Sequence, residues 1–136
     1  QYWPYWQGED GLFTAWIALS EVGQDAGPMC FVRGSQRWGF LGEGDFFSSD
    51  QAALQAHISA SADAAWEECA ALLPAGGVSL HHCLTFHGSH ANTSANARCS
   101  MAVHLRDERA TPVPESDNYY VSHLDEPAYS PVIYGG

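Results

Sequence analysis

The feature that most constrains the fold of this chain is a series of short apolar runs, each of which ends at a turn signal. The runs are rich in β-branched and aromatic residues and are bounded by Gly, Pro or Asn; they cover residues 13–22, 29–33, 78–87 and 100–105. Short strands with this punctuation are typical of β-sandwiches and barrels. The sequence therefore predicts an all-β fold in which these four runs are strands.

One short helix is expected beside these strands. The alanines of residues 51–58 favour a helix there, and Asp50 is a suitable N-cap for it. From about residue 111 to residue 136, proline, tyrosine and acidic residues mix without any period, which predicts an irregular tail. A length of 136 residues fits one domain, 1–136.

The alternation of side chains within the runs predicts a polar interior. Successive residues of a strand point to opposite faces of the sheet. The more polar faces of three runs are expected to carry these groups: Thr14, Trp16, Ala18 and Ser20; His81, Cys83, Thr85 and His87; Arg98, Ser100, Ala102 and His104. A face of small, polar or ionisable groups is what a small barrel needs in order to hold a ligand inside.

Charge and cysteine usage exclude several classes of partner. The net charge is -11, and all five basic residues are arginines, so the chain cannot build the basic face that binds nucleic acid, and polyphosphate ligands are disfavoured. No apolar run approaches the roughly 18 residues that span a membrane. The four cysteines form no CxxC pair and lie in or beside apolar stretches, which favours reduced thiols and a cytoplasmic location.

The most specific pattern in the chain is His87-Gly-Ser-His-Ala-Asn-Thr-Ser-Ala-Asn-Ala-Arg98. It resembles the distal iron-binding segment of the phytanoyl-CoA dioxygenase family, in which His-Gly-Ser ends a strand, an Asn-x-Ser turn follows, and an arginine lies eleven residues beyond the histidine. Three further fragments are similar to other blocks of that family: TAWIAL at 14–19, Gly27-Pro-Met with Gly34-Ser35, and PVIY at 131–134. The resemblance covers almost the whole chain.

This resemblance implies a double-stranded β-helix, or jelly roll, that uses non-haem Fe(II) and 2-oxoglutarate. His87 would be the distal histidine of a facial triad of two histidines and one carboxylate. Arg98 would hold the far carboxylate of 2-oxoglutarate, a task that suits its planar charged fork, with Ser89 assisting and Trp16 forming a wall of the pocket. Without the family pattern, His87 would be interpreted as a hydrogen-bonded rim residue and Trp16 as part of the core.

The sequence departs from the family pattern at the first two iron ligands. The family carries His-x-Asp shortly before an aromatic run; here that run is residues 2–6, and no histidine occurs before His57. We therefore expect a jelly roll without its N-terminal strand, and weak iron binding and negligible turnover of 2-oxoglutarate by these 136 residues alone. The single His-x-Asp, at 123–125, lies in the tail and is expected to have no role in the metal site.

The function that the resemblance implies is the hydroxylation of a small organic substrate by dioxygen. An acyl-CoA substrate fits poorly, because the chain has no lysine for its phosphates, and a neutral or cationic metabolite fits better. The alternative is a catalytically inactive jelly-roll fragment or binding module that lacks the His-x-Asp ligands. In either case a missing strand would leave an exposed sheet edge, through which copies of the chain could form a homo-oligomer.

Overall fold

A computed structural model describes residues 5–8, 11–41, 51–62, 64–114 and 119–135. The chain divides into two compact units, residues 13–105 and residues 1–12 together with 106–136. The expected N-cap Asp50 lies outside the described residues. A single domain over 1–136 stays a prediction.

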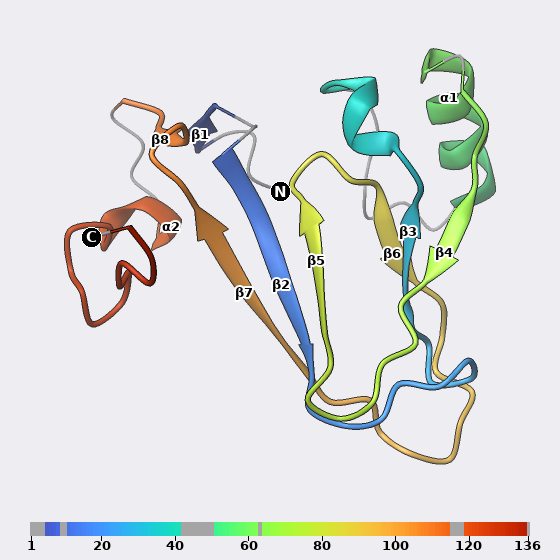
Figure 1. Ribbon diagram of the computed structural model, residues 1–136. Helices are drawn as coiled ribbons and strands as arrows, with labels where there is room; N and C mark the ends of the chain where they lie inside the picture. The colour runs from blue at the N-terminus through green and yellow to red at the C-terminus, as the bar shows by residue number, and fades with distance from the viewer. Residues whose placement is uncertain (1–4, 9–10, 42–50, 63, 115–118, 136) are drawn as a thin grey trace. The chain divides into compact units, whose positions relative to one another are not determined.

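The larger unit contains two three-stranded sheets (Figure 1). In spatial order the first sheet consists of β5 (Val78–His82), β2 (Leu12–Ala18) and β7 (Ser100–Arg106). The second consists of β4 (Glu68–Ala70), β3 (Met29–Val32) and β6 (His87–Ser89). β2 runs antiparallel to β5, and β3 runs antiparallel to both of its neighbours. The all-β class is confirmed, and each of the four predicted regions contains a strand, although two of them differ from the predicted extent.

The core of the larger unit lies between the two sheets. Trp16, Ala18 and Val22 form a buried cluster, against which Met29 of the second sheet packs. Along β2, every second residue is buried, beginning with Leu12, so that Trp16 and Ala18 point inward together. On the other face of this sheet the side chain of Leu80 is 69% exposed. The predicted direction of the β2 side chains is therefore confirmed.

The predicted strand 13–22 is too long, because the chain changes its hydrogen-bond partner after Ala18. The amides of Leu19 and Ser20 both donate to the carbonyl of Cys99, 2.9 and 3.2 Å away. Val22 then forms only an isolated bridge with Leu73.

The prediction of one strand over 78–87 is wrong, since the run forms two strands in different sheets. β5 ends at His82, whose ring Nδ1 accepts a hydrogen bond from the amide of Leu84 at 3.2 Å. The amide of Phe86 donates to the hydroxyl of Ser35 at 2.8 Å, which directs the chain toward β3. β6 then begins at His87. Strand alternation therefore does not extend through residues 83–86.

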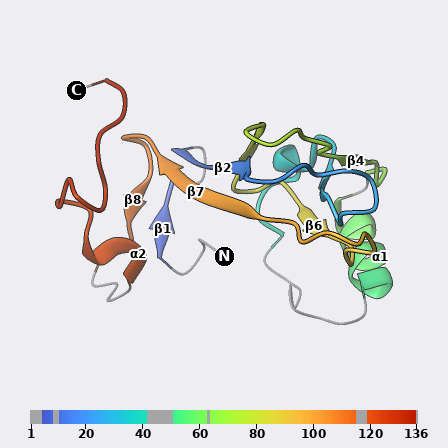
Figure 2. The same cartoon turned by 90° about the horizontal axis from the view of Figure 1, so that it is seen from below.

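The remaining elements are short. Helix α1 (Gln51–Ala62) exceeds the predicted helix by four residues and precedes β4. It stands beside β4 in Figure 1 and is seen close to end-on in Figure 2. A 3-10 helix, η2 (Ser35–Trp38), follows β3. In the smaller unit β1 (Trp6–Gln7) pairs antiparallel with β8 (Thr111–Pro112), and α2 (Tyr119–Ser122) is a single turn. Among the described helices, none has the length and apolar character that crossing a membrane requires.

Candidate functional site

His87 stands at the start of β6 with its side chain on the inward face. Residues directly opposite each other on neighbouring strands share a face of the sheet, and the register pairs His87 with Phe31 and Ser89 with Met29. Because Met29 packs against the core cluster of the first sheet, this face of β6 is turned toward that sheet. His87 and Ser89, both predicted site residues, therefore lie on one inward face.

The ring of His87 is held in one tautomer. Its Nδ1 lies 2.8 Å from the carbonyl oxygen of Thr85, and because a carbonyl only accepts hydrogen bonds, Nδ1 must carry the proton. In the neutral ring Nε2 then keeps its lone pair. Histidines that bind metals commonly have this arrangement, with the second ring nitrogen donating to a backbone carbonyl. The local structure of His87 fits an iron ligand.

A second histidine faces His87 from the opposite sheet. His81 on β5 pairs with Thr14 of β2 and has only 9% of its surface exposed. Its ring centroid is 4.5 Å from that of His87 and 4.9 Å from that of Phe31. Burial, reinforced by the nearby His87 and His104, lowers the pKa of His81 to about 4. His81 is therefore neutral at neutral pH.

From the sequence, His81 was expected only to pack or to line a cavity. Its Nδ1 is buried and has no hydrogen-bond partner among the described residues. Strand alternation alone placed it on an inward face, but its contact with His87 depends on the crossing between the sheets, which the sequence did not reveal. Beside it, the Nδ1 of His104 lies 3.1 Å from the hydroxyl of Thr14, and partial desolvation lowers the pKa of His104.

Arg98 lies against Trp16. The guanidinium carbon is 5.7 Å from the centroid of the indole ring, and Nη1 donates a hydrogen bond to the carbonyl of Gly27. Arg98 is half-buried and forms no ion pair with any carboxylate that the structure describes. In a chain of net charge -11, an arginine without a carboxylate partner is available to bind an anion.

The segment between His87 and Arg98 is fixed by a turn at residues 92–94, as predicted. The side-chain oxygen of Asn92 accepts hydrogen bonds from the amide of Ser94 at 2.9 Å and from its hydroxyl at 2.7 Å. The carbonyl of Asp25 accepts a bond from the amide of Thr93 at 2.8 Å. This turn is thereby attached to the loop before β3, and the loop's Gly27 contacts Arg98.

The structure thus brings the predicted residues together in two pairs, Trp16 with Arg98 and His87 with Ser89. Both pairs belong to inward faces of the larger unit, but no recorded contact joins His87 to Arg98, and their sharing of one cavity stays a prediction. His123 lies in the smaller unit, where its Nδ1 is 2.8 Å from a carboxylate oxygen of Glu126.

Comparison with known proteins identifies the family. The family model described as phytanoyl-CoA dioxygenase (PhyH) matches residues 1–100. The chain belongs to the phytanoyl-CoA dioxygenase family. This family uses Fe(II) and 2-oxoglutarate, and the jelly-roll fold predicted from its sequence pattern is confirmed. No curated protein matches the chain.

Solved structures of non-haem iron enzymes resemble this phytanoyl-CoA dioxygenase family member. The carbocyclase SnoK from nogalamycin biosynthesis is 29% identical with a TM-score of 0.59, covering 83% of this chain and 43% of SnoK. The epimerase SnoN, in complex with Fe³⁺, α-ketoglutarate and nogalamycin RO, is 25% identical with a TM-score of 0.60 (81% and 41% covered). The apo form of the monooxygenase ThoJ is 27% identical with a TM-score of 0.58 (79% and 37% covered). The chain spans about two fifths of the length of these proteins.

Proposed function

We propose that this chain forms part of the active site of an Fe(II)- and 2-oxoglutarate-dependent oxygenase, in which His87 is an iron ligand and Arg98 binds 2-oxoglutarate. The observation that carries the proposal is Arg98 itself, a half-buried arginine that rests on Trp16 and has no carboxylate partner among the described residues. Arg98 lies eleven residues after His87, whose Nε2 is free to bind a metal.

In this proposal His87 presents the lone pair of Nε2 to the iron, while the carbonyl of Thr85 fixes the ring through Nδ1. When bound, iron and 2-oxoglutarate supply the oxidising chemistry that activates dioxygen. His81 lies beside His87 as a neutral ring, so it adds no positive charge next to the metal. Phe31 lies beside both rings, with its centroid 4.9 Å from that of His81 and 6.1 Å from that of His87.

Arg98 provides the charge that selects a dicarboxylate. Its Nη1 is already oriented by the carbonyl of Gly27, and its guanidinium carbon lies over the ring of Trp16. The other nitrogens of the fork therefore remain to pair with the far carboxylate of 2-oxoglutarate. Ser89, on the face of β6 that carries His87, would add a hydroxyl donor to that carboxylate. Trp16 would form the wall of this pocket.

For the substrate, we propose a small neutral or cationic organic molecule that is hydroxylated with dioxygen. The acidic balance of the chain and its lack of lysine disfavour acyl-CoA and nucleic acid. The epimerase and carbocyclase activities named for SnoN and SnoK belong to those proteins. A reducing, cytoplasmic location stays a prediction from four cysteines, which form no disulfide in the part of the chain that the structure describes. A homo-oligomer formed through a sheet edge also stays a prediction.

Nuclear magnetic resonance can test the cosubstrate assignment even if binding is weak. Titrating the chain with 2-oxoglutarate should shift the indole N–H resonance of Trp16 and the Nε–H resonance of Arg98 before others. Arg98→Gln should abolish these shifts by removing the charged fork. Arg33→Gln is the matched control, since Arg33 is exposed and paired with Glu67 at 3.2 Å in the same unit.

The control variant should bind as the unmodified chain does. Shifts at Trp16 that persist in Arg98→Gln, or that disappear in Arg33→Gln, would show that the dicarboxylate binds elsewhere and would refute the role of Arg98.

A further inference from the structure

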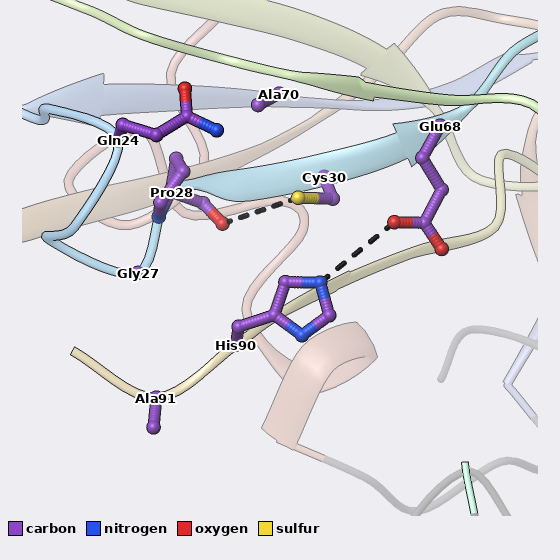
Figure 3. Close-up of a pocket in the computed structure, with 8 residues that line it drawn as sticks. All are labelled: Gln24, Gly27, Pro28, Cys30, Glu68, Ala70, His90 and Ala91. Atoms are coloured by element: carbon purple, nitrogen blue, oxygen red, sulfur yellow. Dashed lines mark hydrogen bonds and ion pairs between the residues drawn. The ribbon is translucent and has the colours of Figure 1, made fainter. Parts of the chain in front are cut away.

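Three side chains of metal-binding type converge on one side of the second sheet. Cys30 comes from β3, Glu68 from β4 and His90 from the residue after β6, and one ligand atom of each lies within 4.8 Å of those of the other two. They line a cavity of about 320 Å³. Figure 3 shows the imidazole of His90 and the carboxylate of Glu68 turned toward each other beside the thiol of Cys30.

This cluster is separate from the proposed iron site. Cys30 pairs with Gly88, whereas the next residue, Phe31, pairs with His87. Because neighbours along a strand point to opposite faces, Cys30 and His87 lie on opposite faces of the sheet. His90 follows Gly88 by two residues, which places it on the Cys30 side.

The carboxylate of Glu68 is oriented for a cation. Its Oε1 accepts a hydrogen bond from the indole Nε1 of Trp66 at 2.7 Å, while its Oε2 lies 3.8 Å from Nε2 of His90. One oxygen is thus held by a donor and the other is directed at the cluster, which is how outer hydrogen bonds commonly position a metal-binding carboxylate. Among the described residues, the thiol of Cys30 has only a long contact, 3.7 Å, to the carbonyl of Pro28.

We propose that Cys30, Glu68 and His90 form a Zn²⁺ site with its fourth coordination position open to the cavity. A thiolate, an imidazole and a carboxylate together suit a borderline-soft cation that accepts tetrahedral geometry, and their present spacing needs only small side-chain rotations to close around it. His90 is free to make that rotation, since its side chain is 79% exposed. The proposal does not depend on the oxygenase function.

A bound zinc ion would join three neighbouring strands. β3, β4 and β6 are held to one another by short ladders of three residue pairs each. A metal bound by residues of β3, of β4 and of the segment after β6 would fix β6, whose other face carries His87. Zinc would thereby stabilise the position of His87 without touching it.

Cobalt can serve as a spectroscopic probe for this site. The full chain, stripped with a chelator and reduced, should bind one equivalent of Co²⁺ and show both tetrahedral d–d absorption and a thiolate-to-cobalt charge-transfer band. Cys30→Ser should remove the charge-transfer band. Zn²⁺ affinity, measured by competition with a chromophoric chelator, should fall about tenfold or more in Glu68→Gln and in His90→Ala.

Two matched variants control the test. Cys69→Ser alters the neighbouring cysteine on β4, which pairs with Phe31 on the other face, and His87→Ala removes the proposed iron ligand; both should leave the band and the Zn²⁺ affinity unchanged. A band that is absent from the unmodified chain, survives Cys30→Ser or is lost in Cys69→Ser overturns the proposal. If Cys30→Ser does not fold, the variant His90→Ala decides the test, because His90 is exposed. An unchanged Zn²⁺ affinity in this variant also overturns the proposal.

Discussion

Acidification should destabilise this chain through His81. The pKa of a histidine in the unfolded chain is near 6.5, whereas burial in the folded state lowers that of His81 to about 4. As the pH falls, the unfolded state therefore takes up a proton before the folded state does. The contribution of His81 to the free energy of unfolding is present in full above about pH 6.5 and is lost progressively down to about pH 4.

The magnitude follows from the size of the shift. Before any discount for solvent, the difference between a pKa of 6.5 and one of about 4 corresponds to about 3 kcal/mol of unfolding free energy. Partial solvent screening and relaxation of the neighbouring rings reduce the expected loss to on the order of 2 kcal/mol. Because Phe has a similar size and does not titrate, His81→Phe should remove this part of the pH dependence.

The assay is urea unfolding followed by tryptophan fluorescence at pH 7 and pH 4.5, with a chelator present so that no metal binds His87. The loss of stability between the two pH values should be smaller in His81→Phe than in the unmodified chain by on the order of 2 kcal/mol. His57→Phe, on the exposed side of α1, should behave like the unmodified chain. An equal loss in His81→Phe and the unmodified chain would refute the reasoning.

Two further predictions concern the segments that position the site. Gly27→Ala should cost about 2 kcal/mol or more of unfolding free energy, because Gly27 has φ +65 and an added Cβ would lie 2.6 Å from the carbonyl oxygen of His90. Gly76→Ala is its control: φ is +83, but the added Cβ meets nothing within 4 Å, so urea unfolding should show a loss of only about 1 kcal/mol. Ser35→Ala should cost about 1–3 kcal/mol, since it leaves the amide of Phe86 without its 2.8 Å partner; an effect below the error of the unfolding curves would contradict the role given to this bond.

The sequence predicted the elements whose signal is local. The alternation at 13–18 correctly turned Trp16 inward, and the Asn92–Ser94 turn formed as its side-chain chemistry indicates. The run 78–87 misled because it contains no Gly, Pro or Asn, so nothing within it marks the end of a strand. The break depends in part on Ser35, which lies 51 residues before the amide of Phe86 that it binds.

Contacts between residues that are far apart in the sequence also limited the prediction of the sites. His87 and Arg98 could be proposed as site residues because a short, specific pattern joins them. The cluster of Cys30, Glu68 and His90 has no such pattern, since its members are separated by 38 and 22 residues and meet only through the pairing of three strands. Similarly, the contact between His81 and His87 arises because the chain crosses from one sheet to the other between them.

The central claim, that His87 binds iron, is tested most directly by titrating the chain with Fe(II) without oxygen while observing its histidine ring protons by nuclear magnetic resonance. The His90→Ala background removes a ligand of the proposed zinc site. Of the remaining six histidines, His87 should broaden first, and His87→Ala should abolish the earliest broadening. If the His87 signal stays sharp while another histidine, such as His123, broadens first, the account of this site is contradicted.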